Sequence, residues 1–169
     1  DQIPSPSDRA EFIRALALTD RYVFDFLADE VLKRQEPETR AFLMDISILP
    51  EIVPSLCNAL TGRSDAQTVL ENLCRRNLFL TQSGETGKTF RYHALFAEFL
   101  SDQLKRENPE RFVELHRRAA EAQKNTAPGQ AIAHYPTAEQ WDEAAQTIEQ
   151  DSEELLRQGF LQTLRGLIE

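Results

Sequence analysis

Apolar residues recur along most of this chain at the three-to-four-residue spacing of amphipathic helices. This spacing predicts helical structure from Asp8 to Gln35, with a weak point near residues 18–23. A second helix is predicted over residues 37–49, opened by Pro37 at a first-turn position. Pro54 opens a shorter helix that Gly62 ends.

The next helix is predicted over residues 65–76. Ser64 and Gln67 have the Ser-x-x-Gln spacing of a capping box, in which the two side chains satisfy free amides of the first turn. The apolar residues that follow fall on one helical face: Ala66, Val69, Leu70, Leu73 and Cys74.

After residue 77 the period changes from helical to alternating. The segments "LFLTQ" and "TFRYH" are rich in aromatic and β-branched residues and flank the glycine-bearing "SGETGK", which predicts a β-hairpin. Helical spacing returns in "ALFAEFLSDQLKRE". Short helices, a hairpin and a trailing helix are the order of a winged-helix module, with residues 65–76 as its recognition helix and the hairpin as its wing.

Everything from Asn108 onward has helical spacing, beginning with an Asn108-Pro109 cap and first-turn proline. Small residues that suit the crossings of paired helices are Ala131, Ala133, Ala144 and Ala145. The prediction is a mainly α protein: a helical lead-in over residues 1–19, a winged-helix domain over 20–106, and the first helices of a tetratricopeptide-like repeat array over 107–169.

Composition is that of a globular chain, with 41% apolar residues, and contains neither a membrane-length apolar run nor a signal-peptide pattern. The first residue is Asp1 and the chain stops at "LRGLIE". We therefore expect a fragment of a larger protein that acts in the cytoplasm, without membrane partners.

The net charge of −9 opposes binding to nucleic acid phosphates. Within residues 64–77 the acidic and basic side chains cancel, and in the wing loop Glu85 cancels Lys88. These balances favour a winged helix that packs against other domains over one that reads DNA.

Gly87-Lys88-Thr89 has the ending of a phosphate-binding loop, but Gln82 stands where the first glycine of that motif belongs. The residues after Thr89 alternate like a strand, whereas a phosphate-binding loop is followed by a helix. We interpret the stretch as the turn of the hairpin.

No catalytic or metal-binding signature is found. Cys57 and Cys74 lie among apolar residues and are expected to be free thiols. His116 and His134 lie within predicted helices and are interpreted as structural. A run without Lys or Arg is interpreted as a solvated face; its acidic residues are Glu139, Asp142, Glu143, Glu149, Asp151, Glu153 and Glu154.

Several ordered motifs from residue 20 to 169 resemble one family: "DRYVFDFLADEVLKRQEPETRAFLMDISILPEIVPSLCNALTG", "LENLCRRNLFL", "FRYHALFAEFL", "LHRRAAE" and "WDEAAQTIE". They are similar to MalT-type, LuxR-related ATP-dependent transcriptional regulators. In that family an ATPase domain precedes a winged helix, helical repeats and a DNA-binding helix-turn-helix. The resemblance implies that this chain is the middle part, with ATP or ADP bound by the parent and no cofactor in the fragment.

The resemblance also extends to signal-transducing ATPases, in which a histidine at the end of the winged helix contacts the nucleotide. His93 stands at the matching place, although Ala94 replaces the aspartate that often follows. The implied partners are the parent's own ATPase and repeat domains, an inducer or regulatory protein bound by the repeats, and DNA through a missing C-terminal domain.

Two other functions remain open on the sequence. One is a stand-alone winged-helix transcription factor that binds DNA directly. The other is a helical-repeat scaffold for a protein partner. The preferred hypothesis is a non-enzymatic switch that couples nucleotide state to inducer binding and assembly, with His93 as the nucleotide-sensing residue.

Overall fold

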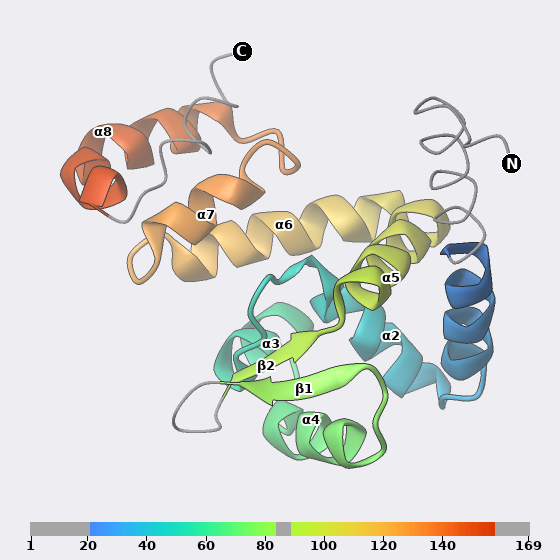
Figure 1. Ribbon diagram of the computed structural model, residues 1–169. Helices are drawn as coiled ribbons and strands as arrows, with labels where there is room; N and C mark the ends of the chain where they lie inside the picture. Colours follow the sequence, from blue (N-terminus) through green and yellow to red (C-terminus); the bar gives the residue numbers. More distant parts are fainter. Residues whose placement is uncertain (1–20, 84–88, 158–169) are drawn as a thin grey trace, which may run out of the picture.

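The computed structural model describes residues 21–83 and 89–157, with side chains described to residue 151 (Figure 1). The described chain is mainly helical with one small hairpin, as the sequence predicts. Residues 21–33 form the first described helix. The elements that follow are α2 (Pro37–Asp45), the 3-10 helix η1 (Ile46–Ile48), α3 (Pro54–Thr61), α4 (Ala66–Arg75), β1 (Leu80–Ser83), β2 (Thr89–Tyr92), α5 (Ala94–Glu107), α6 (Pro109–Gln123), α7 (Pro128–His134) and α8 (Trp141–Arg157).

Local chemistry sets several helix ends where the sequence predicts them. Proline occupies the first turn of α2, α3 and α6, where its missing amide hydrogen costs no helical hydrogen bond. Asn108 caps α6, since its side chain accepts a hydrogen bond from the Arg111 amide at 2.9 Å. Gly62 ends α3 in the left-handed region, with φ of 73°.

The predicted capping box at the start of α4 is wrong. The N-cap residue is Asp65, and it makes no side-chain capping hydrogen bond. Its carboxylate instead binds the guanidinium of Arg63 through two contacts of 2.8 Å. The amide of Ala66 donates to the side-chain oxygen of Asn58 on α3, at 3.1 Å, so a residue from the preceding helix satisfies this end of α4.

The wing is a two-stranded antiparallel hairpin in which Leu80 pairs with Tyr92 and Ser83 with Thr89. A segment before α3 adds a bridge to it, because Ile52 and Phe90 exchange backbone hydrogen bonds of 2.8 and 2.9 Å. The tip at residues 84–88 lies outside the described residues. Because Thr89 begins β2, a strand follows the Lys-Thr pair, as the hairpin interpretation requires.

Two other expectations differ from the structure. The predicted helix over 37–49 changes to a 3-10 turn after Asp45. Among the small residues expected at helix crossings, Ala131 and Ala144 are buried whereas Ala133 and Ala145 are exposed, because consecutive positions on a helix point in different directions. α8 consists of two helical segments that meet at a kink at Asp151, where the dihedral angles are non-helical.

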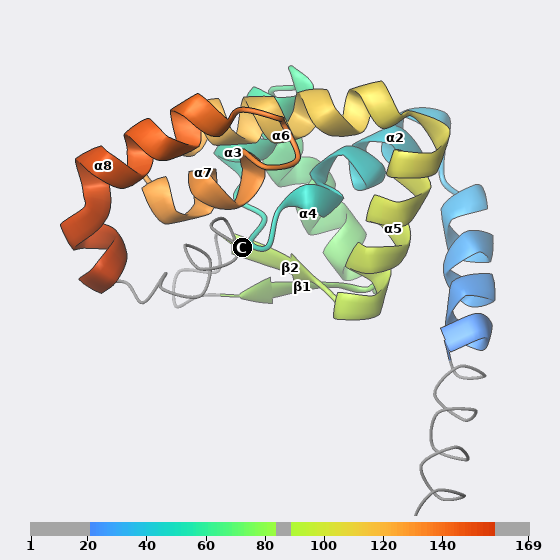
Figure 2. The same cartoon turned by 90° about the horizontal axis from the view of Figure 1, so that it is seen from above.

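Two apolar clusters hold the described residues together. The larger one joins residues 21–33, α2 to α5 and the wing, and it extends into α6 through Leu115 and Ala119. The smaller one joins α6, α7 and α8 around Ile132 and Tyr135. α6 therefore links the winged helix to the helices that follow, and it crosses the molecule between them (Figure 1), as it also runs over α3 when seen from above (Figure 2).

Candidate functional site

His93 lies where the second wing strand passes into α5, and it is the N-cap residue of that helix. Its amide donates to the carbonyl oxygen of Phe79 at 2.8 Å, and its own carbonyl accepts from the amides of Phe96 and Ala97. The backbone of His93 is thus tied to both elements, while the side chain is exposed. The imidazole ring stacks on Phe24, with centroids 5.8 Å apart and an interplanar angle of 26°.

The turn between α4 and β1 builds the floor of this site. Asn77 and Phe79 have positive φ values of 52° and 53°. A bulky aromatic residue rarely adopts this conformation, which costs roughly 1–2 kcal/mol. The Phe79 ring gains packing in return, lying 5.4 Å from the Phe24 ring and 5.0 Å from the Phe96 ring.

A shallow cavity of about 270 Å³ adjoins the imidazole; its lining residues are Asn77, Phe79, Leu80, Thr81, Tyr92 and His93. No Lys, Arg, Asp or Glu lines it. Besides the His93 imidazole, its polar lining consists of the Asn77 amide and the hydroxyl-bearing residues Thr81 and Tyr92.

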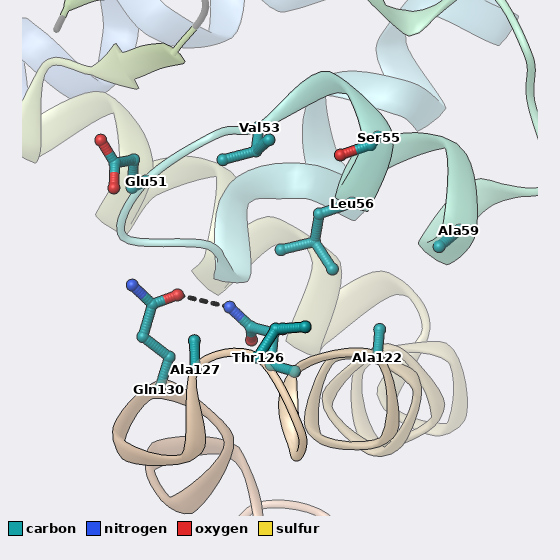
Figure 3. A pocket seen from close by; sticks show the side chains of 10 residues that line it. Glu51, Val53, Ser55, Leu56, Ala59, Ala122, Thr126, Ala127 and Gln130 are labelled. Carbon is teal, nitrogen blue, oxygen red and sulfur yellow. Dashed lines mark hydrogen bonds between the residues drawn. The ribbon is translucent and has the colours of Figure 1, made fainter. Parts of the chain in front are cut away.

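A second hollow, of about 440 Å³, lies at the junction of the winged helix with the helices that follow (Figure 3). Val53 and Leu56 form one wall, and Ala122 and Ala127 face them from the α6–α7 side. On that same side, Gln123 of α6 donates from its side chain to Gln130 of α7. No sequence signal marked this junction, because its residues come from segments about seventy positions apart.

His116 on α6 and His134 on α7 meet, with their Nδ1 atoms 3.0 Å apart. One ring must donate and the other accept, so the pair requires two different neutral tautomers. The pKa of each ring is lowered to about 4, by burial at His116 and by burial together with the nearby His116 ring at His134. The uncharged pair links α6 to α7 through a hydrogen bond, which is consistent with the structural role expected for both residues.

The outer face of α4 resembles no basic DNA-reading surface. Gln67, Glu71 and Arg75 are exposed on it. Gln67 donates to Glu71 at 2.5 Å, and Arg75 donates to the side chain of Asn72, so these polar groups are engaged within the helix. The charges balance here as the sequence indicates.

The other candidate residues group into no site within the described part of the chain. Cys57 is buried and Cys74 partly buried, both as free thiols, and burial raises the pKa of Cys57 to about 12. No cluster of three metal-ligating side chains occurs among the described residues. Most described members of the acidic run are exposed, whereas Glu153 and Glu154 lie beyond the described side chains.

A helical module with a two-stranded wing and an exposed histidine at the wing-to-helix junction defines this chain as a winged-helix protein continued by packed helices. A family model described as the MalT winged helix domain matches residues 28–112. The chain belongs to this family of winged-helix domains.

Curated relatives extend the match beyond that domain. The chain is 37% identical over 149 residues to the HTH-type transcriptional regulator MalT of Vibrio cholerae, covering 87% of this chain and 16% of that protein. It is 36% identical over 148 residues to MalT of Vibrio campbellii, with 87% and 16% covered. It is also 32% identical over 163 residues to the serine/threonine-protein kinase PknK of Mycobacterium tuberculosis, with 96% and 15% covered.

The chain thus spans about a sixth of the length of these relatives. None of the helices within the described ranges is long and apolar enough to cross a membrane.

Proposed function

We propose that this chain is the regulatory middle part of an ATP-dependent, LuxR-related transcriptional regulator. It acts in the cytoplasm as an interdomain switch that couples nucleotide state to inducer binding and assembly. In this proposal a preceding domain binds ATP or ADP, α6 to α8 begin a helical repeat array that receives an inducer or regulatory protein, and a later domain binds DNA. The winged-helix domain of 20–106 and the repeat region of 107–169 meet at α6.

The position of His93 carries the proposal. Its backbone is held by Phe79 and by the first turn of α5, whereas its ring is exposed at one end of the winged helix. Such a ring can donate to a phosphate of a neighbouring domain in one arrangement and lose that contact in another. The ring is therefore suited to report a nucleotide that the chain itself does not hold.

The relatives support a switch over a DNA reader. The matching segment occupies a similar small share of a transcriptional regulator and of a protein kinase. A module shared by proteins with different outputs is better explained by control of a neighbouring domain than by recognition of a DNA sequence. The balanced charge of α4 supports the same choice.

The first test concerns nucleotide binding by this chain alone. Because Thr89 begins a strand, the helix that follows a phosphate-binding loop does not start there. Calorimetric titration of the chain with Mg-ATP should give no measurable heat of binding. A micromolar affinity would refute the assignment of this stretch to a hairpin turn.

The second test uses the full-length protein that carries the chain. His93→Gln keeps a hydrogen-bonding side chain but removes the imidazole, and it should raise transcription of a reporter in the absence of inducer. Thr68→Asn, on the exposed outer face of α4, is the matched control and should leave inducer dependence unchanged. Unchanged inducer dependence in the His93 variant would count against the sensor role.

A third test addresses direct DNA binding. The chain should show no salt-dependent retention of a mixed-sequence duplex, since its recognition-helix charges cancel. Binding that weakens steeply between 50 and 200 mM salt would favour the stand-alone transcription factor.

A further inference from the structure

Large apolar side chains cover the outer face of the helix at residues 21–33. Tyr22 is 74% exposed and Phe26 65%, and beside them Val23 is 55% and Leu27 50% exposed. Within each pair the two residues are four positions apart, so they form one continuous strip along the helix. We call Tyr22, Val23, Phe26 and Leu27 the apolar strip.

Packing on the opposite face fixes the orientation of this helix. Ala28 is fully buried and Leu32 is 1% exposed, both within the main core. Phe24 lies against the same core, between the rings of Phe79 and His93. The helix cannot rotate to bury the apolar strip without exposing these residues. Packing of the inner face therefore keeps the strip on the surface of the described chain.

The helix that carries the apolar strip contacts the candidate sensing residue through its inner face and lies far from α8 (Figures 1 and 2). Figures 1 and 2 both show this helix beside α5, at the end of the molecule opposite α8. An ion pair between Arg21 and Glu98 of α5, with an N–O distance of 3.4 Å, joins the two helices. Phe24, on the inner face of the same helix, stacks on His93. A partner seated on the strip would therefore lie one helix away from the imidazole.

The size of the strip argues for a tethered partner rather than a second copy. Stable association of separate proteins buries about 800 Å² and roughly 20–30 residues on each partner, whereas the strip consists of four residues. A domain on the same chain needs less area, since the linker keeps its effective concentration in the millimolar range. The curated relatives are about six times longer than the matched segment, so chain is available to supply such a domain.

We infer that the apolar strip is the surface on which the nucleotide-binding domain of the full-length protein docks, through an apolar patch of its own. The inference rests on the proposed function and adds to it a contact surface separate from His93. Docking holds the helix, and with it Phe24, against the imidazole. The strip determines the position of the docked domain, and His93 senses the nucleotide bound in that domain.

Hydrogen–deuterium exchange tests this surface. Amides of residues 21–33 should exchange at least 10-fold more slowly in the full-length protein than in the 169-residue chain. Tyr22→Ser with Phe26→Ser should remove that difference in the full-length protein. Trp141→Ser is the matched control, because Trp141 is another exposed aromatic residue, 55% exposed, at the start of α8. It should leave exchange at 21–33 unchanged.

Equal exchange in the two proteins would overturn the inference. Protection that grows with the concentration of the 169-residue chain, together with a doubled mass in sedimentation, would assign the strip to a second copy. Protection already present in that chain, and lost when it is shortened to start at Arg21, would assign the strip to residues 1–20. Either result would show that the nucleotide-binding domain is not what covers the strip, and would overturn the inference.

The inference and the proposed function fail separately. If exchange shows docking but His93→Gln leaves inducer dependence unchanged, the docking surface stands and the sensor role fails. If His93→Gln releases transcription while exchange at 21–33 is equal in both proteins, the sensor role stands and the docking surface fails. The stability of the 169-residue chain is expected to be the same with and without the strip substitutions, since the substituted side chains are mostly exposed.

Discussion

Arg111 on α6 binds the carboxylate of Asp45 at the end of α2 through two contacts, Nη2–Oδ2 at 2.7 Å and Nε–Oδ1 at 3.3 Å. Asp45 is 8% exposed, so its charge lies largely out of water. The pair joins the winged helix to the first helix of the extension. A second, exposed pair joins Arg40 on α2 to Glu107 at the end of α5, with an N–O distance of 2.5 Å.

Removing Arg111 should therefore destabilise the junction. Arg111→Ala leaves the Asp45 carboxylate buried without its partner and should lower the free energy of unfolding by about 2 kcal/mol, less than for a fully buried pair because the arginine is partly exposed. Urea denaturation measures the loss. Arg117→Ala, which removes an exposed pair with Glu114 on the same helix, is the control and should cost less than about 1 kcal/mol.

The cap of α4 offers a direct comparison between two residues. Asn58→Ala removes the oxygen that accepts from the Ala66 amide and should cost about 1 kcal/mol of unfolding free energy. Ser64→Ala should change stability by less than about 0.5 kcal/mol, since Ser64 is exposed and does not occupy the N-cap position. Thermal or urea denaturation of the two variants decides between them. A larger loss of unfolding free energy for Ser64→Ala than for Asn58→Ala would instead support the capping box formed by Ser64.

Acid should weaken the contact between α6 and α7. In the unfolded chain His116 and His134 have pKa values near the ordinary 6.5, whereas in the folded protein burial lowers both to about 4. Between these values the unfolded chain binds more protons, so the free energy of unfolding falls as the pH decreases from about 6.5 to about 4. Above about 6.5 this contribution is fully present.

For His134 alone the loss should be on the order of 2 kcal/mol at pH 5. Urea denaturation at closely spaced pH values measures the slope. The double variant His116→Gln, His134→Gln should flatten the slope in this window, whatever its effect on stability at pH 7. An unchanged slope would show that these rings titrate normally in the folded protein.

The wing and most helix starts could be predicted because short-range chemistry determines them. A proline at a first turn, an Asn-Pro cap at Asn108 and a glycine with positive φ at position 62 act within a few residues of their own backbone. The change from helical to alternating period likewise marks the hairpin locally, as β1 and β2 confirm.

The position of His93 was predicted, but its surroundings were not. That it follows the second wing strand is a property of the local sequence. That Phe24 stacks on its ring depends on how the helix at 21–33 packs across the turn at Phe79, a contact between residues far apart in the chain. The sensing role of His93 stays a prediction, as do its consequences for nucleotide and inducer.

The sequence by itself determined the kinds of elements, their order and the ends that a single cap or proline defines. The tertiary structure decided which distant partner satisfies each remaining group: Asn58 at the start of α4, Asp45 beside Arg111, and His134 beside His116. The reason is physical. Period and capping act through neighbouring residues, whereas these pairs form only after whole helices have packed and their side chains have met at one distance and angle.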